Sequence, residues 1–163
     1  MTPAPKRRGE MPTVDIQVQS PRWGAQPLAE DTVRQAIFTA ADMLSTAGGE
    51  VSIVLTDDSH MQQLNRQWRG IDKPTNVLSF PAAAAAGGML GDIVIAYETL
   101  ARECEDEERL FPHHLAHLAV HGFLHLAGYD HQTDTEAEAM EALESKIMAR
   151  MAMPDPYRAR DRE

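Results

Sequence analysis

Three histidines in the second half of the chain have the residue type and spacing needed to hold a metal ion. His121 and His125 are four residues apart, so on a helix their side chains would lie about 40° apart and project from one face. Gly128 can adopt the positive φ that ends a helix, and the next residues would bring His131 back toward the pair. Three neutral imidazoles can occupy three corners of a tetrahedron and leave the fourth open to water, as a catalytic zinc site requires.

The helix predicted to carry this pair spans residues 111–127, with Pro112 in its first turn. Apolar side chains cover most of its circumference, which is typical of a helix that is buried nearly all round. The remaining sector carries four histidines: His114, His117, His121 and His125. Because a buried polar group without a partner costs about 1–3 kcal/mol, a metal ion would be a favourable partner for two of them.

The order of histidines and glycine, H-x-x-x-H-x-x-G-x-x-H, is also the ligand spacing of metzincin proteases. In those proteases the residue after the first histidine is the glutamate that serves as general base, whereas this chain has Gly122 there. The sequence therefore predicts a metzincin-like metal-binding helix that lacks the base of peptidase chemistry.

Residues 121–131, with the sequence HGFLHLAGYDH, resemble the signature of the YbeY family of bacterial endoribonucleases, also described as ribosome-maturation factors. Residues 69–81 (RGIDKPTNVLSFP), residues 90–95 (LGDIVI) and the glutamate-rich helix after His131 match in the same order. The resemblance covers residues 13–157. It implies a zinc-dependent, single-strand-specific endoribonuclease that acts in ribosomal RNA processing, at the 3′ end of 16S rRNA, and in ribosome quality control.

The resemblance also assigns the arginine that matches Arg69 to catalysis. A guanidinium suits this role because it binds phosphate oxygens in a bidentate way and stabilises the charge that develops on them; a surface ion pair is the alternative. Asp130 is interpreted as a group that holds a ligand imidazole by a hydrogen bond, or as a proton acceptor. His117 is interpreted as a residue that contacts substrate or supports the fold. Asn76 and Ser79 are further candidates for substrate contact.

Imidazole ligands without a thiolate favour one Zn²⁺ ion, although Ni²⁺ and Cu²⁺ also accept imidazole. Such a zinc ion lowers the pKa of its bound water to about 7 and polarises phosphoryl oxygens. The sequence leaves open whether zinc-bound hydroxide or the RNA 2′-hydroxyl attacks the phosphorus atom. Two other functions also stay open: a metal hydrolase with another substrate, and a non-catalytic ribosome-assembly factor whose structural zinc takes a fourth ligand, for instance from His117 or Asp130.

The length and composition limit the domain organisation, the cellular compartment and the partners that we expect. We expect one domain at residues 13–157, a flexible tail at 1–12 and a second tail at 158–163. Cys104 is the single cysteine, so the chain has no internal disulfide, which fits a reducing cytoplasm. No apolar run of about 18 residues is present, and the expected partners are single-stranded RNA and the small ribosomal subunit, with neither DNA nor a membrane.

The formal net charge of −10 is unfavourable for an enzyme that binds phosphates. Much of the acidity lies in residues 103–108 and 136–144, which we expect on outer helical faces. The cleft can then be positive through the metal ion, Arg66, Arg69 and Lys73.

The pattern of apolar residues predicts an α+β fold in which a four-stranded mixed sheet packs against about five helices. Strands are expected at 14–19, 51–56, 76–80 and 91–96, the first two parallel and the last two paired as a hairpin. Helices are expected from about 30 to the Gly48–Gly49 pair, from 58 to 68 with Trp68 in the core, from 98 to 109, from 111 to 127, and after Thr133, which has the capping-box spacing with Glu136.

Overall fold

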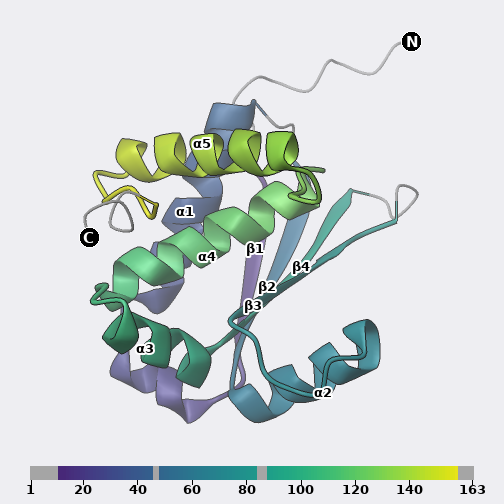
Figure 1. Ribbon diagram of the computed structural model, residues 1–163, viewed down its shortest axis with the longest axis vertical. Coiled ribbons are helices and arrows are strands. Elements are labelled where there is room, and N and C mark those ends of the chain that lie inside the picture. The colour runs from purple at the N-terminus through teal and green to yellow at the C-terminus, as the bar shows by residue number, and fades with distance from the viewer. Residues whose placement is uncertain (1–10, 46–47, 84–87, 158–163) are drawn as a thin grey trace.

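The computed structural model describes residues 11–45, 48–83 and 88–157, and its helices and strands follow the predicted order (Figure 1). The elements in chain order are β1 (Thr13–Val18), the short 3-10 helix η1 (Pro21–Ala25), α1 (Ala29–Leu44), β2 (Glu50–Thr56), α2 (Asp58–Arg69), β3 (Val77–Pro81), β4 (Met89–Ala96), α3 (Tyr97–Asp106), α4 (Phe111–Leu126) and α5 (Asp134–Arg150). Most of the two predicted tails and most of the alanine-rich connection after β3 lie outside the described residues.

The four strands form one mixed sheet in the order β1-β2-β4-β3. Strands β1, β2 and β4 run parallel to one another, and β3 pairs antiparallel with β4 as the hairpin prediction requires. The predicted α+β fold with a four-stranded mixed sheet and five α-helices is therefore confirmed for the described residues. Strand β3 is an edge strand, so one of its sides is free of strand partners.

Helices cover both faces of this sheet. Figure 1 shows α1, α4 and α5 on one side and α2 on the other. The alternation of side chains along β4 produces this division, because successive residues of a strand point to opposite faces. Ile93 and Ile95 belong to the larger core, whereas Val94 and Ala96 pack with Met61 of α2 in a smaller one. None of the helices in the described part of the chain has the length and apolar character needed to cross a membrane.

Two glycines allow α4 to lie unusually close to the β3–β4 hairpin. A Cβ atom added at Gly122 of α4 would lie 2.9 Å from Cγ2 of Ile93 and 3.1 Å from Oγ of Ser79. A Cβ atom added at Gly91 of β4, where φ is +144°, would lie 2.7 Å from Cδ2 of Leu126 in α4 and 2.4 Å from the carbonyl oxygen of Phe80. This close approach holds the histidine-bearing side of α4 against edge strand β3.

The structure corrects several predictions about individual residues. Helix α1 ends at Leu44, where Ser45 takes a left-handed conformation (φ 52°), and so stops before Gly48. Trp68 was expected in the core but is 63% exposed. Helix α2 packs on β3 and β4, and β3 is the edge strand of the described sheet, so the last turn of α2 has no further strand to pack on. The predicted N-terminus of α5 is confirmed, since the Thr133 side chain accepts a hydrogen bond from the Glu136 amide.

The two acidic segments were expected on outer helical faces, but Glu103 is half-buried and Glu144 is buried. Glu103 of α3 accepts hydrogen bonds from Asn76 and pairs with His114. Glu144 of α5 is only 1% exposed. Cys104 of α3 is buried, and burial raises the pKa of its thiol to about 11.

Candidate metal centre and active site

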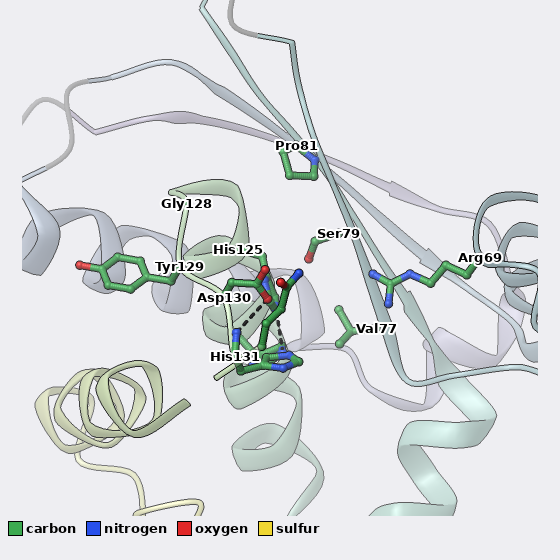
Figure 2. Close-up of a pocket in the computed structure, with 11 residues that line it drawn as sticks. Arg69, Val77, Ser79, Pro81, His125, Gly128, Tyr129, Asp130 and His131 are labelled. Atoms are coloured by element: carbon green, nitrogen blue, oxygen red, sulfur yellow. Dashed lines mark hydrogen bonds between the residues drawn. The ribbon is translucent and has the colours of Figure 1, made fainter. Parts of the chain in front are cut away.

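The structure brings the three predicted ligands together at the C-terminal end of α4 and in the turn that follows. His125 Nε2 lies 3.1 Å from His121 Nε2, and the ring of His131 is 5.6 Å and 5.1 Å, centroid to centroid, from the rings of His121 and His125. One potential ligand atom from each residue lies within 4.8 Å of those of the other two. The side chains of His125 and His131 point toward each other in Figure 2.

The turn after α4 positions His131. Gly128 has a φ of +100°, and two hydrogen bonds close the end of the helix: the Tyr129 amide donates to the Leu124 carbonyl at 2.9 Å, and the Gly128 amide donates to the His125 carbonyl at 3.1 Å. These bonds form the Schellman motif that a glycine in this conformation permits. The chain then reverses direction, so a residue ten positions after His121 can face it.

The donor atoms fit a divalent ion. Two ligand nitrogens of a tetrahedral zinc ion, each about 2.0–2.1 Å from it, are roughly 3.4 Å apart, close to the 3.1 Å separation of the two Nε2 atoms. Burial and the adjacent rings of His121 and His131 lower the pKa of His125, which favours the neutral form that binds metals. The three imidazoles could therefore hold one metal ion.

A second group of potential ligands, Glu103, Glu107 and His114, also lies within 4.8 Å. Its members already have protein partners: His114 Nε2 is 2.8 Å from Glu103 Oε1, and Glu107 forms an ion pair with Arg109 at 3.0 Å. Each of the three residues therefore already has a protein partner, although Nδ1 of the buried His114 has none. Asn76, which we considered for substrate contact, is a further partner of this group because its side-chain amide donates to Glu103 at 2.9 Å.

Glu144 is the site residue that the sequence prediction missed. Its Oε2 lies 3.4 Å from Nδ1 of His121, and its Oε1 lies 2.5 Å from Nε2 of His117 and accepts a hydrogen bond from the Tyr157 hydroxyl at 2.8 Å. A signal was present in the sequence. Glu144 lies four residues after Met140 and three before Ile147, so it falls on the apolar stripe by which α5 packs against α4.

The Glu144 carboxylate stays ionised within the protein. Burial alone would raise its pKa, but hydrogen bonding to His117 and His121 and the charges of these rings lower the pKa to about 2. Burial also lowers the pKa of His117. A carboxylate beside Nδ1 of His121 favours the tautomer with the proton on that nitrogen, which leaves Nε2 as the acceptor that faces His125.

Beside the histidines lies an open cavity of about 520 Å³. It is lined by His121, His125, residues 128–132, and, across from them, Arg69, Val77, Ser79 and Pro81. Figure 2 shows the Arg69 side chain extending toward the histidines, with Ser79 and Val77 between. His117, one turn earlier on α4, is not among the lining residues; it is held by Glu144 instead.

The polar groups of the cavity have definite partners. Ser79 Oγ donates to the Gly122 carbonyl at 3.3 Å, and Asp130 Oδ1 accepts from the His131 amide at 2.8 Å, a backbone contact rather than the predicted bond to a ligand ring. The Arg69 side chain has neither a hydrogen bond nor an ion pair with any residue that the structure describes. Asp130 is the one carboxylate among the lining residues, so the cavity wall is not acidic although the chain is.

The position that holds the general base in metzincins has no room for one. A Cβ atom at Gly122 would already be 2.9 Å from a methyl group of Ile93, and real Cβ atoms essentially never come so close. A glutamate at this position would force α4 away from the sheet. The close packing of α4 on β4 therefore excludes a glutamate at position 122.

Comparison with known proteins gives the family. A family model described as "Endoribonuclease YbeY" matches residues 16–152. The chain belongs to the YbeY family. An Endoribonuclease YbeY of Bradyrhizobium sp. (strain BTAi1) is 51% identical over 93% of this chain and 96% of its own length. Another from Rhodopseudomonas palustris (strain CGA009) is 54% identical over 93% of this chain and 84% of its own length.

A solved structure agrees with this assignment at the level of the fold. The solution structure of a protein from Thermotoga maritima matches with a TM-score of 0.56 and 23% sequence identity, over 86% of this chain and 92% of that chain. The part of this chain that matches the YbeY family model, residues 16–152, includes Arg69, the three histidines and Glu144. Tyr157, which donates to Glu144, follows it.

Proposed function

We propose that this protein is a zinc-dependent endoribonuclease that cleaves single-stranded RNA. The relatives named above are endoribonucleases. The observation that carries the proposal for this chain is the convergence of three imidazoles, at the wall of an open cavity, opposite an arginine without an ion-pair partner among the described residues. Such a site offers Lewis-acid chemistry and a fixed cation for a phosphodiester.

In this proposal His121, His125 and His131 hold one Zn²⁺ ion. When bound, the ion supplies a water of lowered pKa and polarises a phosphoryl oxygen. Arg69 binds the non-bridging oxygens of the scissile phosphate and stabilises the negative charge that they gain as the bond breaks. Asp130 faces the cavity with Oδ1 held by the His131 amide, and its carboxylate is the candidate proton acceptor. Glu144 keeps the His121 ring oriented, and His117 supports Glu144.

We also propose that residues 13–157 act as one catalytic domain in the cytoplasm. Its proposed substrate is ribosomal RNA, in particular the 3′ end of 16S rRNA on the small ribosomal subunit, with a further part in ribosome quality control. The support for these finer points is the family membership. The accessible cavity, about 520 Å³ in volume, suits a flexible single strand better than a paired helix, whose backbone is held rigidly.

The test is an RNA-cleavage assay joined to metal analysis of the same preparations. Wild type is expected to bind one zinc per chain and to cut single-stranded RNA, His121→Ala to lose both, and Arg69→Ala to lose cleavage while it retains zinc. Zinc retention in Arg69→Ala is the control for folding. Full cleavage by Arg69→Ala would remove that residue from the mechanism, and zinc binding without any cleavage by wild type would leave the assembly-factor role instead.

The products distinguish the two routes of attack. A 2′,3′-cyclic phosphate at the new end would show attack by the RNA 2′-hydroxyl, whereas only direct attack by water gives a linear phosphate from the first moments of the reaction. Cleavage of a peptide with no action on RNA would support the hydrolase alternative.

A further inference from the structure

An exposed tryptophan lies next to the proposed catalytic arginine. Trp68 precedes Arg69 in the last turn of α2, and 63% of it is exposed. Its one aromatic contact with the residues that the structure describes is a T-shaped packing against Phe80 of β3, with ring centroids 5.9 Å apart, which leaves most of the indole in solvent. By contrast, the other tryptophan, Trp23, is only 3% exposed. Burial in the core therefore does not account for an indole at this position.

The cations without partners are concentrated at the same place. Five arginines of the described residues form ion pairs with carboxylates: Arg22, Arg34, Arg102, Arg109 and Arg150. Among the lysines and arginines that the structure describes, the four that form none are Arg66, Arg69, Lys73 and Lys146. Three of these four lie within residues 66–73. With Asp72 counted against its three cations, the segment 66–73 has a formal charge of +2 in a chain whose net charge is −10.

The local structure fixes this segment in place. The side-chain amide of Asn65, a buried residue of α2, donates to the Lys73 carbonyl at 2.8 Å, so the segment after α2 folds back along the helix. Arg66 and Arg69 are three residues apart and share a helical face. The Trp68 ring packs on Phe80, and the residues on either side of Phe80, Ser79 and Pro81, line the cavity from the opposite face of β3. The edge strand β3 therefore lies between the indole and the cavity.

We propose that Trp68, Arg66 and Lys73 form a binding surface for single-stranded RNA, on which one unpaired base stacks across the edge strand β3 from the active-site cavity. Exposed aromatic rings combined with unpaired cations are the means by which proteins bind single strands without reading sequence. Arg69 would hold the scissile phosphate, Trp68 would stack a base of a neighbouring nucleotide, and Arg66 and Lys73 would contact backbone phosphates. The inference rests on the proposed endoribonuclease function and adds a substrate-binding surface to it.

The experiment measures binding separately from cleavage. The probe is a short, fluorescently labelled oligouridylate with 2′-O-methyl groups, and gel analysis after each titration checks that it is intact. Trp68→Ala is expected to weaken binding by about 5- to 150-fold, the range that corresponds to the loss of one stacked base. Trp68→Phe, which keeps a ring, should recover most of the affinity. Leu28→Ala, which changes a side chain of similar exposure (68%) at the start of α1, should bind as wild type does.

Two further measurements separate the parts of the surface. Binding of the probe should quench the fluorescence of wild type but not that of Trp68→Phe, because Trp23 is buried. Arg66→Ala and Lys73→Ala should each reduce the slope of log affinity against log salt by about 0.7, the value for one phosphate contact on a single strand, whereas Trp68→Ala should leave that slope unchanged.

Equal affinity of Trp68→Ala and wild type for the probe, with equal thermal stability, would overturn the proposal and leave Trp68 as a protein-docking residue. Cleavage of unmodified RNA by wild type is measured in parallel. If wild type cleaves RNA and Trp68→Ala binds normally, this inference fails and the proposed function stands. If wild type neither binds nor cleaves RNA, both fail.

Discussion

The substitution Glu144→Gln tests quantitatively how the His121 ring is oriented in the proposed metal centre. The change Glu144→Gln keeps the size of the side chain but removes its charge and replaces one acceptor oxygen with an amide donor. The buried carboxylate contacts His117, His121 and Tyr157, and an amide cannot accept from all three. We therefore expect this substitution to loosen the orientation of the His121 ring without displacing α5.

The magnitude follows from the environment of the carboxylate. The lowering of its pKa from 4.5 to about 2 corresponds to about 3 kcal/mol in favour of the charged form. Most of that stabilisation belongs to the shorter contact with His117, because a hydrogen bond at 3.4 Å to His121 is weak. The part that acts on His121 is smaller, and the expected loss of zinc affinity is about 10- to 100-fold, the range seen when hydrogen-bond partners of metal-binding histidines are removed.

The assay is zinc titration of metal-free protein in competition with a chelator of known affinity. Glu141→Gln, an exposed glutamate on the same helix, is the matched control and should bind zinc as wild type does. Tyr157→Phe removes one donor to Glu144 and should give a smaller loss. The melting temperature of each metal-free variant shows whether it is folded. Folded Glu144→Gln with wild-type zinc affinity would refute the assigned role of this carboxylate.

Three other predictions follow from the packing and the buried charges. Gly122→Ala should lower the free energy of urea unfolding by about 1–3 kcal/mol, because the new methyl group overpacks the contact of α4 with the sheet; an unchanged midpoint would show that this contact tolerates the methyl group and contradict the prediction. Burial would raise the pKa of Glu103, but its hydrogen bond with His114 lowers it, so this group stabilises the fold above the ordinary glutamate pKa and the stabilisation is lost as pH falls. Glu103→Gln should therefore flatten the acid limb of the stability curve, and identical curves would remove the effect. Cys104, whose thiol pKa is raised to about 11, should react with a thiol reagent at pH 8 only when denaturant unfolds the protein, and rapid reaction of the native chain would show that it is accessible.

The parts of the site that the sequence predicted are those set by local geometry. His121, His125 and His131 lie within eleven consecutive residues, so helical periodicity and one glycine turn were enough to predict their convergence. The cap at Thr133 and the pairing of β3 with β4 are local for the same reason. Arg69 was different, since only the family resemblance indicated its role.

The residues that sequence reasoning misplaced depend on contacts between distant segments. Glu144 lies 23 residues from His121, and its burial requires α5 to pack on α4 with this residue facing inward. Within α5, only its place on the apolar stripe distinguishes it from the other glutamates. Trp68 has helical spacing suited to a core, but its exposure is decided by β3 being the edge of the sheet. A helical pattern gives the face on which a residue lies and not what covers that face.

In the proposed function, RNA cleavage depends on one divalent ion held by the three imidazoles. The most direct measurement is the rate of cleavage of a single-stranded RNA by the wild-type protein, before metal removal, after complete removal with a chelator, and after addition of one equivalent of zinc. Loss of cleavage on removal and its return at one equivalent are the predicted results. Cleavage at an undiminished rate in protein shown to be free of metal would contradict the account.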